Sequence, residues 1–129
     1  GLSGETYPDR YKGAEFGIHS EKPEISNYLV PQECRNHMNT HWAKLVRGQS
    51  ELYLEKLDCP FHFSTIPHTP HQLESAFHRE ELPPVNRTVI TVCGAMRGVG
   101  GIDTWGNDVE QAYHVHADRD IRFKFRIRG

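Results

Sequence analysis

The sequence has few cysteines, no long apolar run and almost no net charge. Its 129 residues include three cysteines, Cys34, Cys59 and Cys93, and none of them belongs to a C-x-x-C pair. This odd count argues against a disulfide framework or a structural zinc ribbon, although one bridge plus a free thiol stays open. No apolar run approaches the roughly 18 residues that a membrane span needs.

The charge balance excludes further classes of partner. Fifteen Lys and Arg against 17 Asp and Glu give a net charge of −2, which attracts neither nucleic acid nor an anionic membrane. The first ten residues do not resemble a signal peptide, and the absence of an initial Met suggests a fragment. We expect a cytoplasmic protein, with the periplasm as the alternative, and no nucleic-acid or membrane partner.

The length and the aromatic content indicate one folded unit. A chain of 129 residues is a normal size for a single domain, so residues 1–129 are treated as one segment. Two Trp, five Tyr and six Phe argue against disorder. We therefore expect a chain that can build a core.

Short β-prone segments follow one another along most of the chain. Strand-like patterns occur at 28–30, 36–46, 61–63, 88–93 and 111–116, whereas 51–57 fits a helix or a strand. The strongest pattern is at 121–127, where Ile and Phe alternate strictly with Arg and Lys. These patterns predict a mainly β fold of two packed antiparallel sheets.

One helix is predicted from Thr69 to about Glu80. Thr69 can cap it, Pro70 suits its first turn, and Gln72 completes a capping box. The positions spaced for one apolar face are Leu73, Ala76 and Phe77.

A glycine-rich segment carries a tryptophan. Residues 98–106 read Gly-Val-Gly-Gly-Ile-Asp-Thr-Trp-Gly, without the spacing of a nucleotide-binding loop. Glycines permit tight turns, and an indole is costly to leave in water. Trp105 can therefore present its face to a sugar, whose C–H face stacks on aromatic rings. The alternative is that Trp105 folds back over the core as a plug.

Nine histidines are a second candidate for chemistry. On a strand, His114 and His116 would share one face and could form half of a metal site. His62, His68 and His71 also lie near one another in the sequence. No further ligand follows at a recognisable spacing, so histidines on the surface are the favoured interpretation.

Charged pairs and a basic strand complete the candidates. Glycoside hydrolysis needs two carboxylates at a fixed separation, but the pairs Glu80/Glu81 and Asp118/Asp120 are better explained by solvation. The last predicted strand carries Arg122, Lys124, Arg126 and Arg128. They could bind phosphate or nucleic acid, but a solvated face near a sheet edge is the favoured interpretation.

Four stretches together resemble the β-galactosidases of glycoside hydrolase family 2. Residues 98–106 resemble their G-[IV]-G-G-D-x-[ST]-W-[SG] signature, with Ile102 where the family commonly has Asp. Residues 5–10 resemble E-x-Y-P-D-R, and residues 28–36 resemble Y-x-x-P-Q-E-N-G-N-R, shortened around Cys34. Residues 61–82 follow F-x-F-S … L-E-x-A-x-H-x-x-E-L. The order is the same, and the resemblance covers essentially the whole chain.

The resemblance implies the C-terminal portion of the last domain of such an enzyme, which in some bacteria belongs to a separate small chain. That domain is an antiparallel β-supersandwich similar to galactose mutarotase. The family hydrolyses terminal β-D-galactosides such as lactose with retention, and the full enzyme is expected to be a homo-oligomer. Its catalytic glutamates and its Mg²⁺ and Na⁺ sites lie in a TIM-barrel domain. No residue here matches them, so this segment is assigned no catalytic residue, metal ligand or cofactor.

The resemblance also assigns the substrate contacts. Trp105 is expected to line the sugar pocket and to stack on the galactoside, with Asp103 of the same loop as a secondary candidate. The partner is then the TIM-barrel domain or the large chain of the parent enzyme. Two other functions stay open: a free-standing carbohydrate-binding module and an oligomer-interface module.

Overall fold

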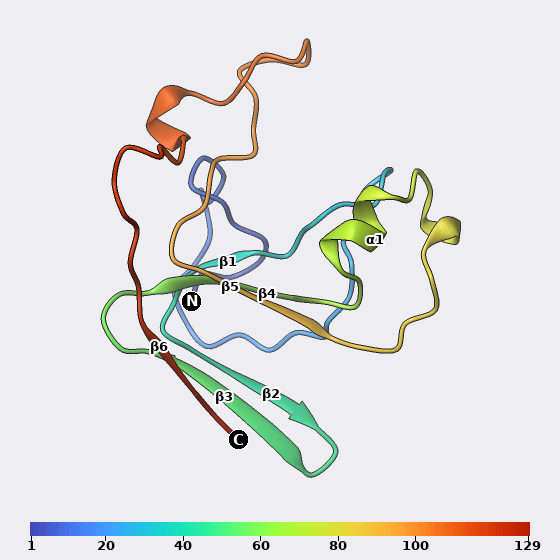
Figure 1. Ribbon diagram of the computed structural model, residues 1–129, viewed down its shortest axis with the longest axis vertical. Helices are drawn as coiled ribbons and strands as arrows, with labels where there is room; N and C mark the ends of the chain where they lie inside the picture. The colour runs from blue at the N-terminus through green and yellow to red at the C-terminus, as the bar shows by residue number, and fades with distance from the viewer.

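A computed structural model describes residues 1–129 and contains two antiparallel sheets of three strands each (Figure 1). The first sheet has the order β1-β4-β5, with β1 at His37–Thr40, β4 at Phe61–Ile66 and β5 at Val89–Cys93. The second has the order β2-β3-β6, with β2 at Trp42–Arg47, β3 at Ser50–Lys56 and β6 at Phe125–Arg128. The predicted mainly β fold of antiparallel sheets with one short helix is confirmed, and a supersandwich is consistent with it.

The chain crosses between the two sheets at short connections. His41 alone separates β1 from β2, and residues 57–60 separate β3 from β4. Just before the first crossing, Asn39 has a positive φ of 53° and makes an irregularity in the pairing of β1 with β4. An extra residue of this kind bends a strand. The bend lets β1 and β2 belong to different sheets although they are almost continuous.

The core is small and has two parts. Ala43, Leu54 and Phe61 are buried where the sheets meet. Cys34, Ile66 and Leu73 are buried at the other end of the first sheet, beside the helix. Only 16 of the 129 residues are buried, so much of the apolar surface of this chain stays uncovered.

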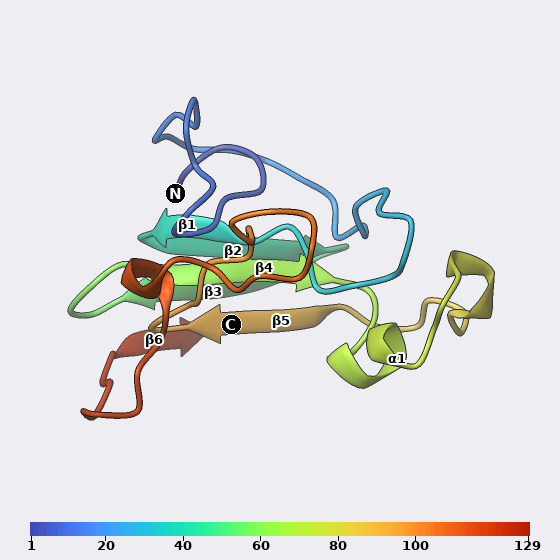
Figure 2. The same cartoon turned by 90° about the horizontal axis from the view of Figure 1, so that it is seen from above.

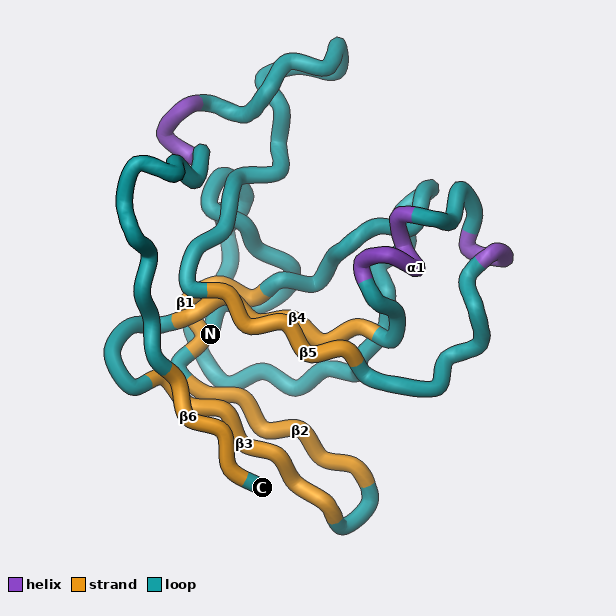
Figure 3. Tube along the Cα trace, in the orientation of Figure 1, coloured by secondary structure: helices purple, strands orange, loops and turns teal.

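Much of the chain is loop, and these loops surround the strands (Figure 3). The N-terminal loops lie on one side of the strands and the helix at one end (Figure 2). The predicted strand at 28–30 is wrong, because Leu29 is 93% exposed and has no strand to pair with. The undecided segment at 51–57 is a strand, β3. No helix is long and apolar enough to cross a membrane, and the three cysteines are free.

The predicted helix begins correctly but is shorter than expected. The helix α1 spans Pro70–Glu74, and Thr69 and Gln72 exchange both hydrogen bonds of the capping box. Further along, the Glu81 carboxylate accepts hydrogen bonds from the backbone N–H groups of Phe77 and His78. These bonds turn the chain out of the helix into the 3₁₀ helix η1 at Arg79–Glu81. Phe77 is consequently 75% exposed instead of lying on the buried face.

Two strand predictions in the last third need correction. The strand expected at 111–116 is wrong, because 111–113 form the 3₁₀ helix η2, closed by a hydrogen bond from the Tyr113 N–H to the Glu110 carbonyl. The strand expected at 121–127 begins only at Phe125. The Lys124 carbonyl still accepts from the Leu57 N–H at 3.0 Å, but the Lys124 N–H donates to the Asp58 side chain at 3.0 Å instead of to a backbone carbonyl.

Candidate functional site

The loop that carries Trp105 projects from one end of the molecule, beyond the strands (orange, top of Figure 1). The Trp105 side chain is 90% exposed. The alternative in which its indole plugs the core is therefore wrong for this chain. An indole held in solvent on a loop is available to stack on a ligand or a partner.

Asp103 organises the tip of this loop. Its Oδ1 accepts a hydrogen bond from the Trp105 N–H at 2.8 Å, and its Oδ2 accepts one from the Asn107 side-chain amide at 2.6 Å. The bond from Trp105 is the largest cause that holds the Asp103 pKa below its ordinary value. Asp103 thus fixes the backbone at Trp105, and its direct contact with a sugar stays a prediction.

The stem of the tryptophan loop, residues 98–100, is anchored by the N-terminal segment. The Asp9 carboxylate accepts hydrogen bonds from the Val99 N–H at 3.0 Å and from the Gly100 N–H at 2.7 Å. The Gly98 N–H donates to the Tyr113 carbonyl at 2.9 Å. Both stretches, 5–10 and 98–106, are recognisable in the sequence. Because roughly 90 residues separate them, no local sequence pattern predicts that they contact each other.

A second carboxylate in the N-terminal segment gathers hydroxyl groups. Glu5 accepts hydrogen bonds from the hydroxyls of Tyr7 and Ser26, each at 2.8 Å, and from that of Tyr28 at 2.7 Å. Burial favours a raised Glu5 pKa, but these three donors outweigh it, and the pKa lies below its ordinary value. The hydrogen bond to Glu5 is also the main cause that raises the Tyr28 pKa to about 12.

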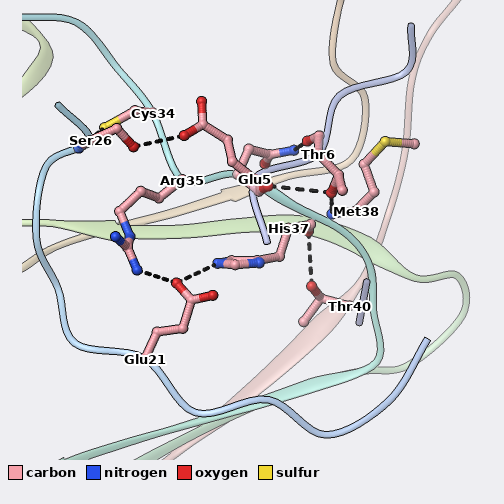
Figure 4. A network of polar contacts seen from close by, with 10 residues as sticks. Glu5, Thr6, Glu21, Ser26, Cys34, Arg35, His37, Met38 and Thr40 are labelled. Carbon is pink, nitrogen blue, oxygen red and sulfur yellow. Dashed lines mark hydrogen bonds and ion pairs between the residues drawn. The ribbon is translucent and has the colours of Figure 1, made fainter. Parts of the chain in front are cut away.

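The surroundings of Glu5 join several segments of the chain (Figure 4). The Ser26 hydroxyl reaches Glu5, and the Ser26 N–H donates to the Cys34 sulfur at 3.3 Å. Glu21 lies between Arg35, with which it forms an ion pair, and His37, whose Nε2 is 3.5 Å away. The stretches at 5–10 and 28–36 therefore meet in space, which their separate positions in the sequence did not reveal.

The histidine candidates do not form a metal site. His114 and His116 are not on a strand, and their rings stack with centroids 5.8 Å apart. His114 is also occupied by a hydrogen bond between its Nε2 and the Val109 carbonyl. His62, His68 and His71 do not gather either, since no group of three or more His, Cys, Asp or Glu side chains is placed to hold a metal ion.

The charged candidates have structural partners. Glu81 caps η1, as described above, and Asp120 pairs with Arg122 at 2.9 Å; Glu80 and Asp118 are exposed. On the edge strand β6, Arg126 pairs with Glu55 at 3.0 Å and Arg128 lies over the ring of Tyr53. Lys124, just before β6, and Arg122 are exposed. These contacts support the interpretation of a solvated, charged sheet edge.

A groove of about 520 Å³ lies beside the edge strand β2 and is lined by β2, β3, the first sheet and parts of the N-terminal segment. Apolar residues along it include Trp42, Leu45, Val46, Phe63 and Ile90. In Figure 3 the two sheets converge near the start of β2 and separate toward the turn between β2 and β3. Trp105 does not line this groove, so the exposed indole and the apolar groove are separate features.

These observations define a class: an antiparallel β domain that presents a tryptophan on an anchored loop and an open apolar groove. Comparison with known proteins gives the family. Residues 1–127 match the family described as beta galactosidase small chain, and the chain belongs to this family.

The relatives are longer than this chain. It is 45% identical over 139 residues to the beta-galactosidase small subunit of Latilactobacillus sakei, covering 98% of the chain and 44% of that subunit. It is 36% identical over 126 residues to a beta-galactosidase of Halalkalibacterium halodurans, and 31% identical over 129 residues to the beta-galactosidase BgaC of Bifidobacterium adolescentis. The matches cover 95% and 96% of this chain but 12% of each of those enzymes.

Proposed function

We propose that this chain is a non-catalytic part of a β-galactosidase and supplies Trp105 to the sugar-binding side of its active site. The observation that carries the proposal is a tryptophan that is 90% exposed on an anchored loop, in a chain of the β-galactosidase small chain family. The substrate is a terminal β-D-galactoside of the lactose type. Its C–H face stacks on the indole while its hydroxyls find polar partners elsewhere.

The catalytic partner is a TIM-barrel domain or a large chain. It provides the two carboxylates of a retaining glycosidase and the Mg²⁺ and Na⁺ sites, whereas this chain contributes no metal ligand. The stacked indole orients the galactosyl ring before the reaction, and orientation of this kind can supply a sizeable part of a rate enhancement. The assembled enzyme is a homo-oligomer in this proposal.

A free-standing carbohydrate-binding module is less well supported. Binding sites usually enclose most of a small ligand, whereas the groove in this chain does not include Trp105. One indole without surrounding walls buries little of a sugar. We therefore expect weak or no binding of galactose by this chain alone.

An interface role is favoured by a specific observation. The groove beside β2 is lined in part by exposed apolar residues, among them Trp42, which is 47% exposed, and Val46, which is 61% exposed. Contiguous apolar surface of this kind is typical of a region that another protein segment covers. This role is compatible with the sugar contact of Trp105, because the two surfaces are separate.

The test compares wild type with Trp105→Ala in a complete β-galactosidase that contains this chain. We expect kcat/KM for a chromogenic β-galactoside to fall by about tenfold or more, because stacking and lost apolar contact together exceed about 1.4 kcal/mol. Trp105→Phe should retain part of the activity, since a smaller ring can still stack.

Thermal melting separates loss of contact from loss of fold. An indole that is 90% exposed contributes little to the core, so the melting temperature should stay unchanged. Equal kcat/KM values for wild type and Trp105→Ala would show that the loop serves packing or assembly and would reject the proposal.

A further inference from the structure

One N-terminal carboxylate holds the stem of the tryptophan loop. Asp9 accepts hydrogen bonds through both of its oxygens, from the adjacent N–H groups of Val99 and Gly100. We propose that Asp9 is a positioning residue for substrate binding, which sets the direction of the Trp105 loop by holding these two N–H groups. This inference rests on the proposed function, because it acts through Trp105.

The stem packs closely against Asp9 and its neighbours at two glycines, Gly98 and Gly100. A Cβ atom on Gly98 would lie 2.8 Å from the Asp9 Cγ and 2.8 Å from the Tyr113 Cβ. A Cβ atom on Gly100 would lie 2.6 Å from the Arg10 Nε. A side chain on Gly98 would therefore push against both Asp9 and Tyr113, whereas the flexible Arg10 side chain could move away from one on Gly100.

Asp9 is itself held in place by the sheet. It lies in a tight turn in which Tyr7 and Arg10 exchange backbone hydrogen bonds of 2.9 and 2.8 Å. Directly before this turn, the buried Thr6 donates its N–H to the Asn36 carbonyl at 2.7 Å, and the Asn36 side-chain amide donates to the Thr6 carbonyl at 2.7 Å. Asn36 directly precedes β1, so Asp9 links the loop to the first sheet.

The loop beyond the stem is closed on itself, so its direction follows the stem. Arg97 and Asp108 form an ion pair across its base. A Cβ atom on Gly101 would lie 2.6 Å from the Asn107 carbonyl oxygen, which shows how closely the two sides approach. Asp103 then fixes the Trp105 N–H inside this closed turn. A rotation at the stem would therefore carry the indole with it.

The geometry of the contact favours a carboxylate. Each Asp9 oxygen accepts from one N–H, whereas an asparagine side chain would place an NH2 donor where one of these oxygens stands. Burial favours a higher Asp9 pKa, but the bonds from Val99 and Gly100 outweigh it and keep the pKa below its ordinary value. The side chain is therefore ionised at neutral pH, and such charge-assisted hydrogen bonds are stronger than neutral ones.

The kinetic test uses the complete β-galactosidase that contains this chain. Asp9→Ala should raise KM for a chromogenic β-galactoside by roughly tenfold with a smaller change in kcat, because a misplaced indole binds the sugar poorly. Asp9→Asn should give an intermediate KM. A merely structural role would lower the active fraction, and so the apparent kcat, while leaving KM unchanged.

A double variant tests whether Asp9 acts through Trp105. Adding Asp9→Ala to Trp105→Ala should cause no further loss in kcat/KM, because the residue being positioned is already gone. The matched control is Asp118→Ala, an exposed aspartate in the turn that precedes β6, which should behave like wild type. Full additivity in the double variant would contradict the inference.

Amide hydrogen exchange, read by mass spectrometry on the same enzyme, gives a measurement that does not depend on sugar. Asp9→Ala should accelerate exchange in peptides that cover residues 98–106 and leave those that cover β3 and α1 unchanged. A wild-type KM and wild-type exchange in Asp9→Ala, beside an impaired Trp105→Ala, would overturn the Asp9 inference alone. Wild-type kinetics in Trp105→Ala would overturn the proposed function and the substrate-positioning role of Asp9, and exchange would still show whether Asp9 holds the loop.

Discussion

Individual carboxylates hold the long loops of this chain where no strand is available to pair. Asp9, Asp58 and Glu81 each accept hydrogen bonds from backbone N–H groups, and Asp103 does so within the tryptophan loop. Glu5 instead accepts from three hydroxyls. Single acidic residues therefore determine the course of segments that a sequence pattern leaves undefined.

The Glu5 cluster predicts a particular dependence of stability on pH. Because its folded pKa lies below the ordinary value of 4.5, ionised Glu5 stabilises the fold above about that pH, and this contribution is lost as the pH falls through the folded pKa. Glu5→Gln should therefore be less stable than wild type at neutral pH, and the difference should shrink in acid. Urea unfolding at several pH values measures it.

A second measurement and a control make the Glu5 prediction specific. Absorbance titration of tyrosinate in Glu5→Gln should show the Tyr28 pKa falling from about 12 toward its ordinary value of 10.0, and the Tyr7 pKa, which burial and Glu5 together raise, should fall as well. Glu74→Gln, at the exposed end of α1, should change neither the Tyr28 pKa nor the acid dependence. A stability difference that is the same at every pH would contradict the prediction.

At the scale of elements, the capping box of α1 gives the next prediction. Thr69→Ala removes the acceptor for the Gln72 N–H and should lower the free energy of unfolding by about 1 kcal/mol. The loss should be felt in the core, because Leu73 of this short helix is buried against Cys34 and Ile66. Urea unfolding checks it. Thr69→Ser, which keeps the hydroxyl, should stay close to wild type, and an equal loss in both variants would contradict the role of the cap.

Local signals predicted the elements better than their ends. The capping box at Thr69 and the β-branched run before Cys93 depend on neighbours in the sequence, so α1 and β5 could be predicted. The helix end and the start of β6 depend on Glu81 and Asp58, whose targets are set by tertiary contacts. For the same reason the sequence pointed to Trp105 but not to Asp9, which lies about 90 residues away from the loop stem.

At the scale of the whole molecule, the two sheets do not close over a full core. The groove of about 520 Å³ leaves apolar side chains of β2 and β4 in contact with solvent. The chain covers 44% of the small subunit from Latilactobacillus sakei and 12% of the longer relatives. We therefore expect the groove to be covered when this chain is part of a complete subunit or enzyme, since desolvation of such surface stabilises an assembly.

Two valines of similar exposure test this expectation. Val46 lines the groove and is 61% exposed, whereas Val85 lies outside it and is 64% exposed. In this chain alone, Val46→Asp and Val85→Asp should both have small effects, because the new charge stays in water. In the complete protein, Val46→Asp should destabilise by about 3 kcal/mol or more, since covering the groove would bury an unpaired charge. Val85→Asp should remain harmless there.

Thermal melting of both variants, in this chain and in the complete protein, measures the difference. The informative quantity is the loss of melting temperature caused by Val46→Asp in the complete protein minus the loss in this chain alone. An intrinsic defect of β2 would lower the melting temperature equally in both. A Val46→Asp variant that melts like Val85→Asp in the complete protein would show that the groove stays open to solvent. The apolar surface beside β2 would then need another explanation, while the loop chemistry of Trp105 and Asp9, which lies elsewhere, would be unaffected.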